Sequence, residues 1–362
     1  MKAARFYGQR DIRVDDGVSL PQVKPGQILV DIEWCGICGS DLHEYLAGTA
    51  IPTEGHPHSL TGEHLPVVMG HEFCGRVREV SAGSKLQPGQ AVMVDPRLYC
   101  KTCHRCQSAQ TNICTQWAFL GLSGLGGGFS EAVAVEEEMC HVLPDSIPLS
   151  HAALIEPLVV ARHALKSAGV PSFDHLTILI LGGGPVGLAI IFNLRARGVK
   201  RIFVSEPTQK RQKHTAVLAD EVFNPLQIKV GDRCRELTDG KGVDLVFDCA
   251  GIAPGLVDGM DALRAGGTYV NVAGWEEPFV VPMGLFMMKE LVLRVAMAYT
   301  DEDFREVVEE FVAGKFKGAE QMITSRILLD DVVTKGFEEL VNHKDDHVKI
   351  LVTPKPECLA KA

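Results

Sequence analysis

The sequence predicts an α/β protein in which a β-rich domain and a doubly wound parallel sheet are separate. Short alternating runs divided by Gly and Pro fill residues 1–95, which is typical of antiparallel β-structure. Continuous apolar runs alternate with helical stretches after residue 158, which is typical of a parallel sheet covered by helices. A chain of 362 residues is too long for one small core and favours two domains.

Composition and charge are those of an ordinary globular protein. Hydrophobic residues make up 46% of the chain and charged residues 23%. The formal net charge of −10 disfavours non-specific binding to nucleic acid, which is itself negative. The stretch from Met1 to Tyr7 has no apolar segment typical of a secretory signal, and we expect no membrane partner. We therefore expect a cytoplasmic protein whose 11 cysteines stay reduced and serve metal binding rather than disulfides.

The first stretch rich in polar chemistry follows a predicted strand at residues 28–34. Residues 36–43 read Gly-Ile-Cys-Gly-Ser-Asp-Leu-His, which brings a thiol, a hydroxyl, a carboxylate and an imidazole close together. Polar groups gathered on a glycine-bounded turn at the end of a strand serve chemistry more often than packing. The candidate site residues of this stretch are Cys38, Ser40, Asp41 and His43.

Two later stretches could complete a metal site with Cys38. Gly70-His71-Glu72 follows an apolar run, and Glu156 lies within the sequence Leu-Ile-Glu-Pro-Leu. A thiolate, an imidazole and a carboxylate suit zinc, and three protein ligands leave the fourth tetrahedral position open, as in catalytic sites. A lone Cys is more often a buried apolar residue. The prediction of a catalytic zinc site therefore depends on the combination.

The polar loop from Gly48 to Pro66 carries three histidines, His56, His58 and His64. Three histidines in one loop suggest a metal site. They lie among turn residues without the spacing of metal ligands, however. We therefore expect a solvated loop near the pocket.

The strongest local signal is the spacing Cys-x2-Cys-x2-Cys-x7-Cys. Four thiolates surround one zinc ion with no open position, so the predicted site is structural, and metal binding would help this loop to fold. An iron–sulfur cluster is the alternative, because it too takes four thiolates. The spacing lacks the ferredoxin patterns, which favours zinc. The predicted ligands are Cys100, Cys103, Cys106 and Cys114.

A buried strand and a glycine-rich turn open the second domain. Residues 175–181 are continuously apolar, and Gly-Gly-Gly-Pro-Val-Gly follows at 182–187 before a helical stretch that ends at Arg197. In G-x-G-x-x-G, the first glycine permits the turn, the second lets the backbone approach a pyrophosphate, and the third lets helix and strand pack closely. The helix N-terminus then offers N–H groups to phosphate oxygens. The predicted cofactor-binding residues here are Gly182, Gly184, Pro185, Val186 and Gly187.

An acidic residue after the next strand supports a dinucleotide site. The strand at 201–205 ends at Glu206, roughly twenty residues past the glycines, where a carboxylate binds the adenosine ribose hydroxyls. A carboxylate at this place would repel a 2′-phosphate, so NAD is favoured over NADP. Lys210 and Arg211 nearby leave NADP open, and Arg211 is counted among the cofactor-binding residues.

The remaining runs complete the parallel sheet and return the chain to the first domain. Strand-like runs that alternate with helical stretches lie at 243–249, 267–272 and 291–295. A helix and a last strand, which rejoins the first domain, are expected at 301–313 and 348–352. The predicted domains are 1–157 with 300–362, and 158–299.

The order of these motifs resembles the zinc-containing medium-chain dehydrogenases, the superfamily of alcohol and polyol dehydrogenases. The resemblance covers the whole chain, because the motifs around Cys38, His71 and Glu156, the four-cysteine lobe and the dinucleotide fold appear in the family's order. Within this family, the chain is most similar to the 2,3-butanediol (acetoin) dehydrogenases. The segments that carry this likeness are residues 34–45, 204–206 and 335–340.

The resemblance implies a GroES-like β-rich catalytic domain, a Rossmann domain, NAD, and one catalytic and one structural zinc ion per chain. It makes Glu72 a second carboxylate able to approach the metal, and it lets Asp41 orient His71. Cys35 matches no ligand position, and strand packing is favoured over a redox pair with Cys38. The implied ligands of the catalytic zinc are Cys38, His71 and Glu156.

The resemblance also implies hydride transfer between NAD and a small alcohol or ketone. Zinc would lower the pKa of the alcohol, and Ser40 would pass the hydroxyl proton through the nicotinamide ribose to His43 near solvent. A vicinal diol has a second hydroxyl that could approach the metal or Glu72, so 2,3-butanediol and acetoin are the expected substrates. The alternatives are a sorbitol- or xylitol-type polyol, a bulkier secondary alcohol and, more distantly, a non-catalytic NAD-binding protein.

Family members are homodimers or homotetramers, commonly joined through the sheet edge of the cofactor domain. For this edge the sequence suggests the apolar strand 268–272 and the residues near Val280 and Val281. A group of methionines follows in the same domain, where flexible side chains either fill the core or widen the tolerance of a pocket. These residues are Met283, Met287, Met288 and Met297.

Overall fold

The computed structural model describes residues 1–48, 56–275 and 278–360. The chain divides into two compact units, of which unit 1 comprises Met1–Glu156 and Thr300–Ala362, and unit 2 comprises Pro157–Tyr299. Unit 1 is discontinuous in sequence because the chain leaves it after Glu156 and returns at Thr300. Part of the expected histidine loop, residues 49–55, lies outside the described residues.

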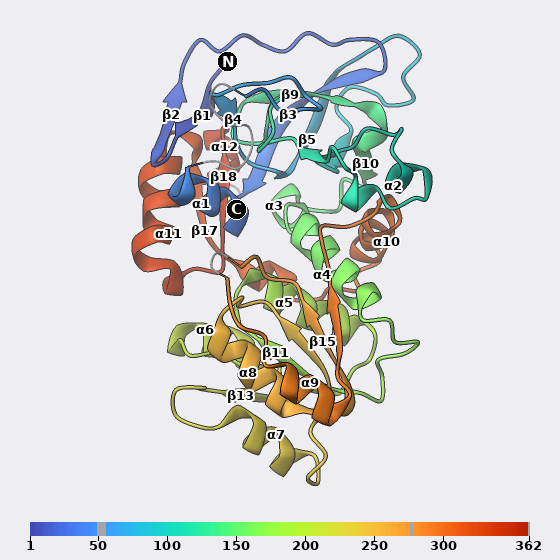
Figure 1. Ribbon diagram of the computed structural model, residues 1–362. Helices are drawn as coiled ribbons and strands as arrows, with labels where there is room; N and C mark the ends of the chain where they lie inside the picture. The colour runs from blue at the N-terminus through green and yellow to red at the C-terminus, as the bar shows by residue number, and fades with distance from the viewer. Residues whose placement is uncertain (49–55, 276–277, 361–362) are drawn as a thin grey trace. The chain divides into compact units, whose positions relative to one another are not determined.

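Unit 1 is built on a seven-stranded sheet with the order β10-β6-β5-β3-β18-β17, in which β9 also pairs with β3 (Figure 1). Its strands are β3 (Gln27–Gly36), β5 (Glu72–Val80), β6 (Ala91–Val94), β9 (Ala132–Glu136), β10 (Cys140–Leu143), β17 (Ile323–Leu328) and β18 (Lys349–Thr353). Since β18 is antiparallel to β3, with Leu351 opposite Gly36, the predicted return of the last strand to the first domain is confirmed. The C-terminal strand therefore lies beside the strand that leads into the Cys38 motif.

Two smaller sheets and several short helices complete unit 1. The sheets have the orders β2-β1-β4 and β7-β8. Their strands are β1 (Ala3–Gly8), β2 (Asp11–Asp15), β4 (Val67–Val68), β7 (Arg97–Leu98) and β8 (Ala118–Phe119). The α-helices are α1 (Gly39–Ala47), α2 (His104–Gln107), α3 (Leu149–Ala152), α10 (Asp301–Val312), α11 (Glu338–His343) and α12 (Pro356–Leu359). The 3-10 and π turns are η1 (Thr111–Ile113), η2 (Glu137–Met139), η3 (Ala319–Met322), η4 (Leu329–Asp331), η5 (Val332–Phe337) and η6 (Lys344–Asp346).

Aromatic residues join the two sequence segments of unit 1 in one core. Phe73, Phe129 and Phe337 are fully buried, and the rings of Phe129 and Phe337 lie 6.1 Å apart. Burying a side chain of this size stabilises a fold by roughly 1.5–3 kcal/mol. The C-terminal segment is therefore a structural part of the domain that carries the Cys38 motif.

Unit 2 contains a six-stranded sheet with the order β13-β12-β11-β14-β15-β16, and every pair in it is parallel. This is the doubly wound order, which reverses between β11 and β14, and it confirms the predicted fold class (Figure 1). The strands are β11 (Thr177–Leu181), β12 (Arg201–Ser205), β13 (Glu221–Phe223), β14 (Val243–Asp248), β15 (Leu263–Asn271) and β16 (Val292–Val295). The helices of this unit are α5 (Pro185–Ala196), α6 (Gln209–Ala216), α7 (Val230–Leu237), α8 (Ala253–Ala262) and α9 (Met283–Lys289), while α4 (Ile155–Ser167) begins in unit 1.

The edge strands of this sheet are β13 and β16. The strand at 268–272 belongs to β15, which is paired with β14 on one side and with β16 on the other, so the run at 291–295 ends the sheet on this side. All four residues of β16 are exposed. Within the described residues, no helix is both long and apolar enough to cross a membrane.

Candidate active site

Three potential metal ligands converge where β3 and β5 meet. The last residue of β3, Gly36, is opposite Glu72, the first residue of β5. Cys38 and His71 are close to these two residues in sequence, and Cys38 is the N-cap of α1. One ligand atom each of Cys38, His71 and Glu72 lies within 4.8 Å of the other two. The strand register thus brings together a thiol, an imidazole and a carboxylate.

Residues of the first turn of α1 face both nitrogens of the His71 ring. Asp41 Oδ1 lies 3.3 Å from Nδ1, and Ser40 Oγ lies 3.2 Å from Nε2. Burial alone would lower the pKa of His71, but the nearby Asp41 and Cys38 charges outweigh this and raise it well above its ordinary range. A carboxylate on Nδ1 selects the tautomer in which Nε2 is free to bind a metal ion.

Glu72 forms a buried ion pair with Lys349, the first residue of β18. Lys349 Nζ lies 2.7 Å from Glu72 Oε1 and 2.6 Å from Oε2, and it also donates to the Ile37 carbonyl at 3.1 Å. Both side chains are only 1% exposed. Burial lowers the pKa of Lys349, but the charges of Glu72, Cys38 and Glu156 more than compensate, and the pKa is raised. Lys349 is therefore a fixed cation beside the candidate metal site.

Gly36 leaves the space that the Glu72 carboxylate occupies. A Cβ atom at Gly36 would lie 2.0 Å from Glu72 Oε2 and 3.2 Å from Lys349 Cδ. The first distance is far inside van der Waals contact, so a larger residue would have to displace the carboxylate. The glycine of the Cys38 motif thus has a steric role that its sequence position alone does not reveal.

Glu156 lies in the first turn of α4 and is buried. It is not one of the three residues whose ligand atoms converge, but its charge contributes to the raised pKa of Lys349, which places it near the site. Its part as a zinc ligand stays a prediction. His43, in α1, is exposed, and Cys35 is fully buried in β3, as expected for strand packing.

Two aromatic residues that the sequence does not single out border His71. The Phe119 ring meets the His71 ring edge-on at 6.1 Å, and the Trp117 ring lies 5.8 Å from Phe119. Both follow the four-cysteine lobe, where no motif marks them. Of the loop histidines, His58 accepts backbone N–H groups of Leu60 and Thr61, so it shapes a turn rather than a metal site.

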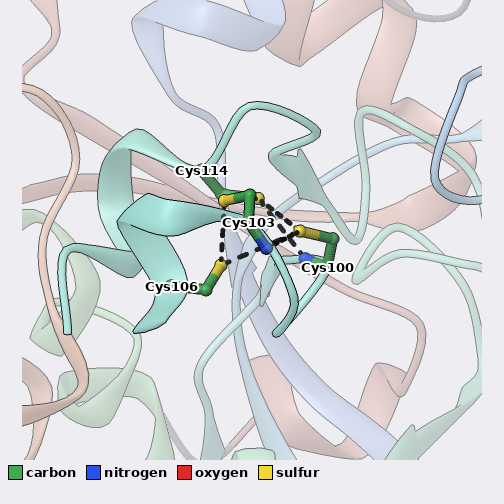
Figure 2. Close-up of side chains that lie close together, drawn as sticks. All are labelled: Cys100, Cys103, Cys106 and Cys114. Atoms are coloured by element: carbon green, nitrogen blue, oxygen red, sulfur yellow. Dashed lines mark hydrogen bonds between the residues drawn. The ribbon is translucent and has the colours of Figure 1, made fainter. Parts of the chain in front are cut away.

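The four predicted lobe cysteines converge around one point (Figure 2). Four sulfur–sulfur distances, 3.5, 3.6, 3.9 and 4.0 Å, join them. Backbone N–H groups of Thr115 and Cys106 lower the pKa of Cys103 to about 5, which favours its thiolate form. Burial and the neighbouring thiols raise the pKa of Cys106 to about 12. The negative charge of the cluster therefore gathers first on Cys103 rather than on Cys106.

In unit 2, the glycine-rich turn has the geometry that the sequence suggests. Gly182 has a φ of +95°, in the left-handed region that favours glycine. A Cβ at Gly187 would lie 2.0 Å from the Gly182 carbonyl oxygen, so helix α5 and the turn are in direct contact. At Gly184 a Cβ would meet only Arg211 Nη1, at 3.7 Å, so its backbone faces open space. Pro185 and Val186 begin α5.

Glu206 ties this turn to the end of β12. One carboxylate oxygen accepts the N–H of Gly183 at 2.7 Å, and the other accepts the N–H of Thr208 at 2.8 Å. The side chain is buried in unit 2. A carboxylate therefore lies directly beside the glycine-rich turn, and the Arg211 guanidinium lies near Gly184 of the same turn.

Comparisons with known proteins agree with this geometry. Residues 24–145 match the family described as alcohol dehydrogenase GroES-like domain, and residues 185–313 match the zinc-binding dehydrogenase family. An (R,R)-butanediol dehydrogenase of Neisseria gonorrhoeae is 38% identical over 98% of this chain and 99% of that protein. The chain belongs to the zinc-containing medium-chain dehydrogenases. The resemblance predicted from the sequence motifs is thereby confirmed.

Further relatives of this dehydrogenase share its full length. An (R,R)-butanediol dehydrogenase of Bacillus subtilis is 37% identical over 98% of this chain and all of its own length. The crystal structure of a 2R,3R-butanediol dehydrogenase from Bacillus subtilis superposes with a TM-score of 0.90 at 35% identity, covering 98% of this chain and 99% of the other. This chain therefore shares the folds of both its units, and their order along the chain, with that dehydrogenase.

The side chains of this zinc-containing dehydrogenase suit two zinc ions. A tetrahedron with Zn–S bonds of about 2.3 Å has sulfur–sulfur edges of about 3.8 Å, and the lobe distances of 3.5–4.0 Å bracket this value. Such a site is closed and therefore structural. The second group, which combines a thiol, an imidazole and a carboxylate, is typical of catalytic zinc sites.

Proposed function

We propose that this dehydrogenase transfers a hydride between NAD and a vicinal diol or hydroxyketone, with 2,3-butanediol and acetoin as the substrate pair. The observation that carries the proposal is the set of full-length relatives, 36–38% identical, that are named (R,R)-butanediol dehydrogenase. The convergence of Cys38, His71 and Glu72 supports it, because a protein that had lost catalysis would not need to retain this donor set. The proposed location is the cytoplasm.

The two domains would have different roles. Residues 1–157 and 300–362 form the catalytic domain, and residues 158–299 bind the cofactor. Cys38, His71 and Glu156 would hold the catalytic zinc, which when bound supplies a Lewis acid that polarises the substrate oxygen. Support for Glu156 comes from its burial and from its charge near Lys349. The four lobe cysteines would hold the structural zinc.

Residues of α1 would handle the proton. Ser40 Oγ lies 3.2 Å from His71 Nε2, the nitrogen proposed to bind the metal, so its hydroxyl is next to the place where a substrate oxygen would lie. Ser40 would accept the hydroxyl proton and pass it toward His43, whose exposed imidazole can release it to solvent. Asp41 would keep the His71 ring in its tautomer.

The cofactor would bind at the glycine-rich turn. The open space beside Gly184 allows close approach of a pyrophosphate, and the N-terminus of α5 at Pro185 would face its oxygens. Glu206 would accept the ribose hydroxyls and repel a 2′-phosphate, which favours NAD. Arg211, whose guanidinium lies near Gly184, would contact the cofactor phosphates.

The proposal is tested by NADH formation with the zinc-loaded protein. The substrates are (R,R)-, meso- and (S,S)-2,3-butanediol, with sorbitol and a long secondary alcohol as comparisons. We expect fast oxidation of a butanediol with a preference among its stereoisomers. Oxidation of the polyol or the long alcohol alone would keep the chemistry and overturn the substrate. No oxidation of any of them, with zinc and NAD bound, would overturn the proposed activity.

A further inference from the structure

Two charged side chains in the catalytic domain are shielded from bulk solvent. Glu72 and Lys349 are each 1% exposed and face each other at 2.6 and 2.7 Å. A buried charge without a partner is strongly unfavourable, so each group depends on the other. The carboxylate of Glu72 is also one of the three groups whose ligand atoms lie within 4.8 Å of one another. Glu72 therefore has two possible cationic partners, the lysine and the metal ion.

The lysine itself is held in place. An ammonium group has three donors, and Lys349 directs its donors at both oxygens of Glu72 and at the carbonyl of Ile37. Its backbone lies at the start of β18, which is paired with β3 on one side and with β17 on the other. The ammonium group cannot follow the carboxylate if Glu72 moves toward the metal without losing the Ile37 bond.

We propose that Lys349 is a positioning residue that holds the Glu72 carboxylate off the catalytic metal and so keeps the fourth coordination position open. This inference rests on the proposed function, since it concerns the same zinc site. Without the lysine, the buried carboxylate has the metal ion as its nearest remaining cation and becomes a fourth protein ligand. The position that a substrate oxygen needs is then closed.

Gly36 provides an independent way to separate the pair without removing a charge. A methyl group there would lie 2.0 Å from Glu72 Oε2 but 3.2 Å from Lys349 Cδ, so G36A would push the carboxylate off its place and shift the lysine stem only slightly. If the ion pair keeps the position open, K349M and G36A have the same effect on the metal. A mere change in local charge would affect K349M alone.

The experiment uses the full-length protein with cobalt in the catalytic site and zinc in the lobe. Imidazole, a neutral ligand, is titrated while the cobalt d–d absorption bands report its binding to the open position. We expect K349M and G36A to bind imidazole about tenfold more weakly than the unaltered protein, the scale at which groups that position metal ligands act. K349R, which keeps the charge and the donors, should bind imidazole nearly as the unaltered protein does.

Imidazole binding to K349M and G36A as tight as to the unaltered protein would overturn the proposal. Weaker imidazole binding in K349M alone would also overturn it, because the lysine would then act only through its charge and not by holding the carboxylate. If K349M is not recovered folded, G36A decides, since it retains both charged groups. Neither substrate nor NAD enters the measurement, so its result is separate from the test of butanediol oxidation.

Discussion

At the scale of single residues, a few close contacts set the geometry of the candidate site. Asp41 faces one nitrogen of His71 at 3.3 Å, and Ser40 contacts the other at 3.2 Å. Gly36 leaves room for Glu72, whose carboxylate is held by Lys349. The chemistry of the site therefore depends on residues that bind no metal as much as on the ligands themselves.

The glycine at position 36 gives a prediction on stability. In G36A the new methyl group would collide with Glu72 Oε2, and overpacking of this kind costs about 1–3 kcal/mol. We expect a lower midpoint of thermal unfolding for the zinc-loaded variant. The matched control is G39A, because a Cβ at Gly39 meets nothing within 4 Å and alanine suits the start of α1. Equal midpoints for the two variants would show that Gly36 has no steric role.

Some residues of the candidate site could be predicted from the sequence, but Lys349 could not. Cys38, His71 and the lobe cysteines stand in recognisable spacings, so their convergence could be predicted. Lys349 lies 277 positions from Glu72, in a strand whose next three residues are apolar, and no spacing links the two. A lysine in an otherwise buried strand was the available signal, because such a charge needs a partner.

At the scale of elements, the strand register and the short helices bring the site residues together. The antiparallel pairing of β3 with β5 places Gly36 opposite Glu72, and β18 adds Lys349 from the far end of the chain. The four-cysteine lobe differs from these elements, since its helix α2 has only four residues and none of them is buried. A bound metal ion would therefore contribute to the order of this lobe.

The lobe gives a prediction on metal content. We expect C103S to hold one zinc ion per chain where the unaltered protein holds two, because three thiolates and a hydroxyl bind zinc far more weakly. The peptide between residues 96 and 118 should then be cut more readily by proteases. Zinc analysis and limited proteolysis measure both effects. C358S, outside the cluster, is the control and should keep both ions and the protection.

The strands of unit 2 could be predicted closely. Apolar runs of strand length identified β11, β12 and β14 and the turn before α5, because a strand buried on both faces needs continuous apolar residues. Strand order is different, since it depends on contacts between distant segments. The runs at 267–272 and 291–295 could be predicted as strands, but their pairing as the neighbours β15 and β16 is seen only in the structure.

At the scale of the whole molecule, the exposed edge suggests how two chains associate. We propose a homodimer in which β16 of one chain pairs with β16 of another, in the family's manner or as half of a tetramer. Val292, Leu293 and Val295 are 40%, 47% and 65% exposed, and an unpaired apolar edge strand is a ready template for pairing. The exposed residues of α9 would extend the contact; these are Met283, Met287 and Met288.

A charge on this edge tests the dimer. L293K would place an ammonium group in the proposed interface, so we expect the molecular mass in light scattering to fall toward that of one chain. V142K, on an exposed apolar residue of unit 1, is the control and should leave the mass unchanged. An unaltered mass for L293K would mean that the chains associate through another surface or remain single.

Acid stability is a second property of the whole molecule and follows from His141 in β10. Its ring stacks on Phe304 of α10, with ring centroids 4.7 Å apart. Burial lowers the pKa of His141 from its ordinary value of 6.5, and the charges of Arg97 and Arg305 act in the same direction against those of Asp95 and Asp301. The folded protein therefore binds a proton at this ring less readily than the unfolded chain does.

The sign of the pH dependence follows from this difference. Above about pH 6.5 the ring is neutral in both states, and its full contribution to stability is present. As the pH falls below that value, the unfolded chain takes up the proton first, so the free energy of unfolding decreases until the folded pKa is passed. We expect the midpoint of thermal unfolding of H141Q to fall less between pH 7 and pH 5 than that of the unaltered protein. H151Q should act in the same direction, because burial also lowers the pKa of His151. A midpoint that falls equally steeply in H141Q would mean that carboxylates alone determine the acid limit of this fold.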